Sequence, residues 1–210
     1  MYQSRQYGMV DAAGAAFSFT GSECHAWAGG RTGDGYAVQG NLLAGEGVVE
    51  ALASVYEARD DLPLPERLLT ALLAGDRAGG DARGRQGAAL YVARVDGGYA
   101  GFNDRYVDLR VDDHADPIVE LQRLLGMHRL LFEHPNAEAL LELTGDTKLR
   151  LEAVLIRAGV LARTSETWGD AAQEALESLM GVENLEERLV KAGWVDPLVL
   201  EFLERKFGAA

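Results

Sequence analysis

The sequence predicts an α+β protein in which a segment of strands and helices is followed by a small all-helical domain. Glycine and short apolar runs are concentrated before residue 111, whereas amphipathic helical patterns fill the remainder of the chain. We therefore expect an α+β segment over residues 1–115, a connecting helix over 116–135 and a helical domain over 136–210.

The composition is that of a globular protein and disfavours several classes of function. Of the 210 residues, 48% are hydrophobic and 25% are charged, and the formal net charge is -13. An acidic chain is repelled by a phosphate backbone, so we expect no nucleic-acid partner. No apolar run reaches the ~20 residues of a membrane-spanning helix, and we expect no membrane association.

The expected compartment is the bacterial cytoplasm. The sequence starts without a basic stretch followed by an apolar core, which is the pattern of a secretory signal. The single cysteine, Cys24, cannot form an internal disulfide, and this fits a reducing compartment.

The first segment begins with a pattern typical of a β-hairpin. Residues 7–10 and 15–20 are short apolar stretches, and the sequence Asp-Ala-Ala-Gly at 11–14 has the composition of a turn. A glycine-rich loop is expected over 28–35, and a third strand over 36–42.

Two helices and a second group of strands complete the first segment. Apolar residues recur at helical spacing in 48–58 and 64–74. The uninterrupted apolar run at 88–93 predicts a strand with both faces covered, in the middle of a sheet. The remaining expected strands are a short one at 98–102 and a half-buried one at 107–111.

From Asp116 onward the pattern is helical. Asp116 can cap a helix that has Pro117 at its first position. Further amphipathic helices are expected at 137–143, 148–158, 170–180, 185–190 and 197–207. The glycines expected to end these helices are Gly145, Gly159, Gly181 and Gly193.

One acidic cluster could in principle hold a hard divalent cation. Its members are Asp108, Asp112, Asp113, His114 and Asp116. We favour the alternative, in which Asp116 is a helix cap and the other carboxylates are solvated on a strand and a loop. We expect no metal site and no cofactor.

The loop sequence GGDARGRQG could contact an anionic substrate group. It supplies flexible backbone together with Asp81, Arg83, Arg85 and Gln86. It lacks the Lys-Ser/Thr pair of a phosphate-binding P-loop, and a strand follows it where a P-loop requires a helix. A loop kept glycine-rich only by tight turns is an equally good interpretation.

The remaining cysteine, histidine and tryptophan side chains are expected to have structural roles. Cys24 and His25 are neighbours, and on an extended segment they point to opposite faces, so Cys24 is expected to be a small buried hydrophobic residue. His128 and His134 carry no ligand spacing. Trp27, Trp168 and Trp194 are expected to be core or groove residues.

Three separated stretches within residues 5–125 form a recognisable set: MVDAAGAAFSFTGSECHAWAGGRTGDGYAVQGNLLAG, GGDARGRQGAAL and YVDLRVDDHADPIVELQRL. Together they resemble a bacterial family of unknown function that is placed among the N-terminal-nucleophile (Ntn) hydrolase-like proteins. The segment GVENLEERLVKAGWVDPLVLEFL is similar to the C-terminal domain of part of that family, which is described as peptidoglycan-binding.

The resemblance implies a four-layer αββα sandwich and amide hydrolysis by an N-terminal Thr, Ser or Cys whose own α-amine acts as base. The chain starts at Met1-Tyr2, which offers no such nucleophile. We therefore expect an N-terminally incomplete sandwich that is not catalytic as given, and whose unpaired sheet edge another chain could cover.

The resemblance also implies roles for four side chains. Asn41, in the sequence QGN, is the candidate donor to an oxyanion, because a neutral amide donates without titrating. Asp81, Arg83 and Gln86 are candidate substrate contacts. For all four, hydrogen bonding within a turn or at a sheet edge is an equally good alternative.

Three functions remain open from the sequence. The first is hydrolysis of a small amide by a full-length form that carries the N-terminal nucleophile. The second is non-catalytic binding of peptidoglycan or a peptide by the helical domain. The third is oligomerisation through the same helices, and we expect a homo-oligomer.

Overall fold

A computed structural model describes residues 1–208; residues 209 and 210, the end of the expected helical domain, lie outside the described residues. The chain divides into an N-terminal unit, Met1–Leu125, and a C-terminal unit, Gly126–Ala210. The division falls inside helix α3, Pro117–Phe132. The class is α+β, and the limits at residues 115 and 135 remain predictions.

The N-terminal unit begins with the predicted hairpin. After a 3₁₀ turn at Tyr2–Ser4, β1 (Gln6–Val10) pairs antiparallel with β2 (Ala16–Thr20). Asp11 stabilises the turn between them, because its Oδ1 accepts hydrogen bonds from the backbone N–H groups of residues 13 and 15, each at 2.9 Å.

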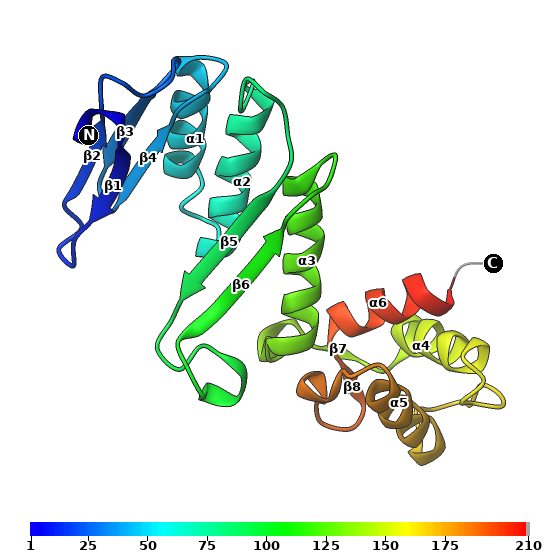
Figure 1. The fold of residues 1–210 in the computed structure, drawn as a ribbon. Coiled ribbons are helices and arrows are strands. Elements are labelled where there is room, and N and C mark those ends of the chain that lie inside the picture. The colour runs from blue at the N-terminus through cyan, green and yellow to red at the C-terminus, as the bar shows by residue number, and fades with distance from the viewer. Residues whose placement is uncertain (209–210) are drawn as a thin grey trace. The chain divides into compact units, whose positions relative to one another are not determined.

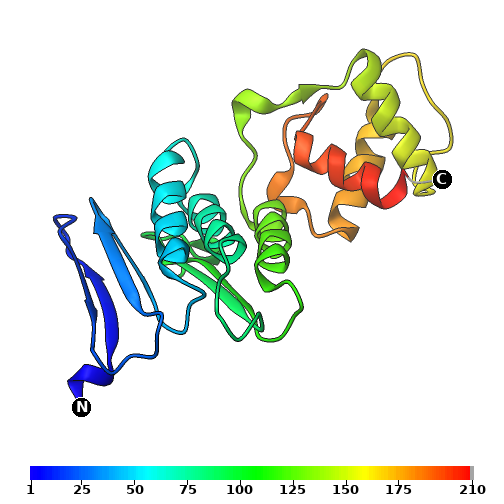
Figure 2. The ribbon, with the colours of Figure 1, turned by 90° about the horizontal axis from the view of Figure 1, so that it is seen from above.

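A second hairpin packs face to face against the first. β3 (Gly29–Gly33) pairs antiparallel with β4 (Tyr36–Gly40), and β1 lies against β4 while β2 lies against β3. Figure 2 shows the two hairpins as neighbouring layers at the N-terminal end. The absence of a side chain at Gly8 leaves room for β4, since a Cβ there would lie 3.0 Å from the Cβ of Ala37.

The prediction of a loop over 28–35 was wrong. Residues 29–33 are strand β3, although the segment Gly-Gly-Arg-Thr-Gly has a poor intrinsic tendency to form strands. Pairing with β4 and packing against β2 hold it in place, and both are interactions that local composition does not encode.

Helix α1 (Glu46–Ala58) covers the β3–β4 hairpin, and helix α2 (Leu64–Arg77) packs beside α1. α1 contacts both strands of the hairpin. Figure 1 shows α2 between α1 and the second pair of strands. Pro65 occupies the start of α2, where its missing N–H has no helical partner to lose.

The second pair of strands is β5 (Ala88–Ala93) and β6 (Arg105–Val111), which are antiparallel and show a shift in register between Val92 and Ala93. Buried side chains from β5, β6, α2 and α3 form the core of this part of the unit. They are Leu69, Leu90, Val92, Val107, Val111, Leu121 and Leu125.

Two predictions about these strands were wrong. β5 is not covered on both faces: its burial alternates, and Tyr91 is 60% exposed. Among the described residues β5 pairs with β6 alone, so it does not lie in the middle of a sheet. The expected strand at 98–102 is a 3₁₀ turn, Tyr99–Gly101, in which Ala100 has a φ of 53°.

The C-terminal unit is a small helical unit closed by a two-stranded ladder. In chain order its elements are the last part of α3, a 3₁₀ turn at Ala137–Ala139, β7 (Leu141–Glu142), α4 (Gly145–Arg157), α5 (Asp170–Val182), a 3₁₀ turn at Glu186–Arg188, β8 (Trp194–Val195) and α6 (Pro197–Phe207). β7 pairs antiparallel with β8. Asp196 caps α6 by accepting a hydrogen bond from the N–H of Leu198 at 2.8 Å.

The helices predicted at 137–143 and 185–190 were wrong, because the first segment forms a 3₁₀ turn followed by β7 and the second forms a single 3₁₀ turn. Gly181 was predicted to end a helix, and it lies inside α5. The apolar residues of these segments are buried by tertiary packing, for example Leu143 and Leu185, and this packing needs no helical periodicity.

No helix of residues 1–208 combines the length and the apolar character that crossing a bilayer requires.

Candidate functional site

A groove between β4 and β5, which we call the β4–β5 groove, is a concave feature of the N-terminal unit. It consists of two cavities of about 540 and 830 Å³ that share three lining residues. The shared residues are Leu52 on α1, Leu72 on α2 and Ala89 on β5. The two cavities therefore adjoin at these residues, and α1 and α2 contribute to the lining of both.

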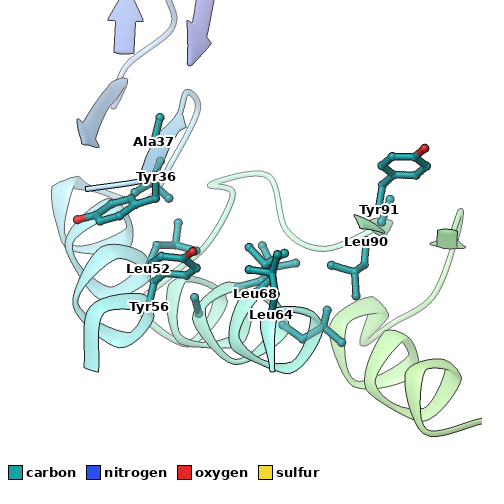
Figure 3. A pocket seen from close by; sticks show the side chains of 14 residues that line it. Tyr36, Ala37, Leu52, Tyr56, Leu64, Leu68, Leu90 and Tyr91 are labelled. Atoms are coloured by element: carbon teal, nitrogen blue, oxygen red, sulfur yellow. The ribbon is translucent and has the colours of Figure 1, made fainter. Parts of the chain in front are cut away.

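Apolar side chains line the first cavity. Figure 3 shows Leu52, Leu64 and Leu68 on the helices, between Tyr36 on one side and Tyr91 on the other. No Asp, Glu, Lys or Arg is among the residues that line this cavity. A charged ligand would lose its hydration there without a partner, so this end of the groove suits uncharged groups.

The two strands run in opposite directions across the groove. The first cavity brings residues 35–38 of the β4 hairpin opposite residues 89–91, and the second brings Gln39 and Leu43 opposite residues 87–89. Among the described residues β4 pairs with β3 and β5 pairs with β6. The strand edges that border the groove therefore have no strand partner.

The loop between α2 and β5 is tied to the chain that follows β4. A single antiparallel bridge joins Leu43 to Asp81. Two backbone hydrogen bonds flank it. The N–H of Ala82 donates to the carbonyl oxygen of Leu42 at 2.7 Å, and the N–H of Ala44 donates to the carbonyl oxygen of Gly80 at 2.9 Å. This bridge ties the groove's two sides together near the second cavity.

The structure places Asp81, Arg83 and Gln86 in the lining of the second cavity, together with Arg85. Arg83 donates two side-chain hydrogen bonds to the carboxylate of Asp81, at 3.0 and 2.7 Å, and its backbone N–H donates a third at 2.8 Å. These bonds lower the pKa of Asp81 to about 2. Arg85 is paired in the same way with Asp76, at 2.7 Å.

Because each of these guanidinium groups already has a carboxylate partner, the loop holds its own charges in compensated pairs. A ligand anion would have to share or displace Asp81 or Asp76 to reach Arg83 or Arg85. The role of Asp81, Arg83 and Gln86 as substrate contacts stays a prediction.

Asn41 lies elsewhere, in the network that joins the two hairpins. Its Nδ2 donates to Oε1 of Gln6 at 3.0 Å, and Nε2 of Gln6 donates to the carbonyl oxygens of Gly40 at 2.8 Å and Gly29 at 3.2 Å. Asn41 is not among the residues that line either cavity of the groove. Its role as an oxyanion donor also stays a prediction.

The cysteine and the acidic cluster do not form a reactive centre. Cys24 is half-buried rather than fully buried, and its thiol donates to the carbonyl oxygen of Arg5 at 3.5 Å. His25 is exposed. Within residues 1–208 no group of three or more His, Cys, Asp or Glu side chains could hold a metal ion, and this includes the acidic cluster around Asp112.

A second candidate site lies in the C-terminal unit. Nε1 of Trp168 donates to Oε1 of Gln173 at 2.9 Å, and the same oxygen accepts the N–H of Gly193 at 3.3 Å. The next residue, Trp194, has the ammonium of Lys191 4.2 Å from its ring centroid. We call Trp168, Gln173, Lys191 and Trp194 the Gln173 cluster.

Sequence reasoning missed this cluster as a unit. Both tryptophans are half-buried and Lys191 is exposed, so the cluster presents aromatic, amide and ammonium groups at the surface. Its members come from two segments of the chain, residues 168–173 and 191–194. The two dispersed tryptophans in the helical part were the only local signal.

These features define a class of protein: an α+β scaffold with a groove between unpaired strand edges, joined to a helical unit with a surface aromatic cluster. The chain belongs to the family of unknown function DUF1028, whose model matches residues 1–121. Residues 131–203 match a second family model, described as "Putative peptidoglycan binding domain".

One solved structure supports the family assignment. It is a crystal structure of a protein from Silicibacter pomeroyi that carries the same family name, with 30% sequence identity and a TM-score of 0.52. The similarity covers 70% of this chain and 55% of that protein, so the chain spans little more than half the length of its solved relative. No protein of curated function matches the chain.

Proposed function

We propose that this protein binds peptidoglycan fragments without cleaving them, and that the Gln173 cluster makes the contact. The observation that carries this proposal is that Oε1 of Gln173 accepts hydrogen bonds from the indole of Trp168 and from the N–H of Gly193, the residue before Trp194. These two bonds hold both half-buried indole rings near the surface. The cluster lies within residues 131–203, the stretch that matches the peptidoglycan-binding model.

The chemistry of the cluster suits a glycan that carries short peptides. Indole faces pack against the apolar faces of sugar rings. The indole N–H of Trp168 is bonded to Gln173, and Nε2 of Gln173 donates one hydrogen bond to Glu177, so the second N–H of this amide is the one that can donate to a hydroxyl or acetamido oxygen. The ammonium of Lys191 can pair with a peptide carboxylate, because its contact with Trp194 leaves its N–H groups free to reorient.

Co-sedimentation with purified, insoluble peptidoglycan tests the proposal. We expect the wild-type chain to sediment with it and Trp194→Ala to lose at least tenfold in affinity. The matched control is Phe102→Ala, which removes an 83% exposed aromatic side chain from the N-terminal unit and should bind like the wild type. A wild-type chain that stays in the supernatant would overturn the proposal.

A second candidate function is amide hydrolysis on an Ntn-hydrolase-like scaffold. It is supported by the packing of α1, the β3–β4 hairpin and the β1–β2 hairpin in successive layers, the order that an αββα sandwich requires. In this proposal the nucleophile is the N-terminal Thr, Ser or Cys of a longer, processed chain. Asn41 would donate to the oxyanion, and Asp81, Arg83 and Gln86 would contact the substrate.

A panel of small amides tests this second function. The chain as given should show no turnover above background, whereas a version extended at its N-terminus to begin with a free Thr, Ser or Cys should hydrolyse at least one of them. Blocking the α-amine of that version by acetylation should abolish turnover, because the amine is the base. An inactive extended form would count against the scaffold's being catalytic.

Self-association through the amphipathic helices and a cytoplasmic location complete the proposal. Light scattering at micromolar concentration tests the first, and a monomer would exclude it. Cell fractionation tests the second, because a cytoplasmic protein would meet peptidoglycan precursors and a wall-associated one would meet the finished polymer.

A further inference from the structure

A fully buried carboxylate lies beneath the loop that carries Trp168. Glu152, on α4, has none of its surface exposed, and Lys148, one turn earlier on the same helix, is 5% exposed. Removing two charges from water is unfavourable unless their attraction and further hydrogen bonds offset it. The groups that make those further hydrogen bonds show what the buried pair holds in place.

The further hydrogen bonds all come from one residue of the loop between α4 and α5. Nζ of Lys148 lies 2.8 Å from Oε2 of Glu152 and also donates to the carbonyl oxygen of Ser165. The hydroxyl of Ser165 lies 2.8 Å from Oε1 of Glu152, and the backbone N–H of Ser165 donates to the same oxygen at 3.4 Å. The buried pair therefore contacts the carbonyl group, the N–H and the side chain of a single loop residue.

The rest of this loop has few attachments of its own. No hydrogen bond between backbone groups involves residues 162–168, all of which belong to the described part of the chain. Trp168, at the end of the loop, donates its indole N–H to Gln173 at 2.9 Å and packs against the C-terminal core. The loop is therefore attached at Ser165, to the buried pair, and at Trp168.

Ser165 lies close enough in the chain to influence the position of Trp168. Two residues separate them, and the Ser165 hydroxyl is also 2.7 Å from the carbonyl oxygen of Thr167, the residue directly before Trp168. A segment without backbone hydrogen bonds opens at a low cost in free energy. Releasing Ser165 should therefore free the backbone that leads into Trp168.

We propose that Glu152 and Ser165 are positioning residues for the Gln173 cluster. Together they hold the loop over residues 162–168 so that the indole ring of Trp168 stays bonded to Gln173 and is presented to the ligand. Neither residue contacts the ligand itself. The inference rests on the proposed binding of peptidoglycan, and it extends that site from the surface aromatic groups to a buried carboxylate.

Ser165→Ala in the full chain tests the proposal, because it removes the hydroxyl and keeps the Lys148–Glu152 pair. We expect the indole N–H of Trp168 to exchange with solvent about tenfold faster, followed by NMR, while that of Trp27 stays unchanged as an internal reference. The pKa of Glu152 should rise, because the hydroxyl that donates to its Oε1 is gone.

Peptidoglycan affinity in the co-sedimentation assay should fall about fivefold in Ser165→Ala, because binding must now order the loop. The thermal unfolding temperature should stay near that of the wild type, since Ser165 is exposed. Loss of affinity without loss of stability distinguishes a positioning role from a merely structural one.

Two further variants serve as controls. Ser165→Thr keeps a hydroxyl at this position and should restore both the slow indole exchange and the affinity. Ser178→Ala makes the same change as Ser165→Ala at an exposed position on α5, outside the loop, and should resemble the wild type in both measurements.

Three outcomes would overturn the proposal: an unchanged indole exchange of Trp168 in Ser165→Ala, an unchanged pKa of Glu152 in that variant, and an equal loss of affinity in Ser165→Thr. A wild-type chain that does not sediment would overturn the proposed function instead. The indole exchange needs no ligand, so it would still decide whether Glu152 and Ser165 position Trp168.

Discussion

The Asp81–Arg83 pair shows how the glycine-rich loop organises its own charges. Both partners are partly exposed, with side-chain exposures of 33% and 71%, so the pair shapes the loop more than it stabilises the fold. The three hydrogen bonds from Arg83 nevertheless hold the pKa of Asp81 at about 2.

We expect Arg83→Gln to raise the pKa of Asp81 toward its ordinary value of 3.8, while the remaining backbone N–H of residue 83 keeps it below that value. Carboxyl chemical shifts followed by NMR during an acid titration measure the change. The matched control is Arg85→Gln, which frees Asp76 and should leave the pKa of Asp81 near 2. An unchanged pKa in Arg83→Gln would contradict this assignment.

A buried ion pair in α4 anchors the loop that follows this helix. Nζ of Lys148 lies 2.8 Å from Oε2 of Glu152 and donates to the carbonyl oxygen of Ser165, while Oγ of Ser165 donates to Oε1 of Glu152 at 2.8 Å. Burial raises the pKa of Glu152, but the hydrogen bonds from Lys148 and Ser165 outweigh it, so the pKa lies below 4.5.

Glu152→Gln should lower the free energy of unfolding by about 3 kcal/mol, because it leaves the ammonium of Lys148 buried without a counter-charge. The wild-type chain should also lose stability as the pH falls below 4.5 through the lower pKa of the folded state. Chemical denaturation at several pH values checks both. Glu120→Gln, at a partly exposed pair with Arg123, should change stability by less than about 1 kcal/mol.

At the scale of the elements, a glycine allows the end of β2 to lie close to the backbone before β1. A Cβ at Gly21, directly after β2, would lie 2.1 Å from the carbonyl oxygen of Gln3, a rigid backbone atom. A Cβ at Gly47, in the first turn of α1, would meet nothing within 4 Å. The same substitution should therefore have opposite effects at the two positions.

We expect Gly21→Ala to destabilise the N-terminal unit, because the backbone must shift to avoid the clash. Gly47→Ala should stabilise it by about 0.5–1 kcal/mol, through the higher helix propensity of alanine. Thermal unfolding of the two variants beside the wild type measures both changes. Equal changes in melting temperature for the two variants would show that the residue after β2 does not pack against the backbone of Gln3.

The elements also show where local sequence is informative. The long helices α1, α2, α4, α5 and α6 and the β1–β2 hairpin follow from apolar spacing and turn residues, which act over a few residues. β3 and the β7–β8 ladder do not, because glycine-rich or two-residue strands exist only through pairing with a distant partner. The expected helix at 137–143 failed for the same reason: β7 pairs with β8 instead.

At the scale of the whole molecule, each unit has its own core. The C-terminal core is built on fully buried leucines, including Leu151, Leu155, Leu185, Leu200 and Leu203, whereas that of the N-terminal unit centres on Val107 and Leu121. Each unit is therefore expected to lose stability independently when its own core is damaged.

Leu155→Ala should lower the stability of the C-terminal unit by about 2–5 kcal/mol, since it opens a cavity at a fully buried position. Amide hydrogen exchange should accelerate in α4, α5 and α6 and remain unchanged in α1 and α2. Leu149→Ala, on the same helix but 55% exposed, is the control and should have little effect. Faster exchange throughout the chain in Leu155→Ala would show that the two units unfold together.

The sequence by itself determined the α+β class, the change to helices after Pro117 and the residue types of the loop that contains Asp81 and Arg83, because these depend on local periodicity and composition. Only the tertiary structure decided that β5 is an edge strand, that β4 and β5 border a common groove, and that Gln173 joins Trp168 to the segment before Trp194. Each of these depends on contacts between residues far apart in the chain, and such contacts leave no periodic pattern in a single sequence.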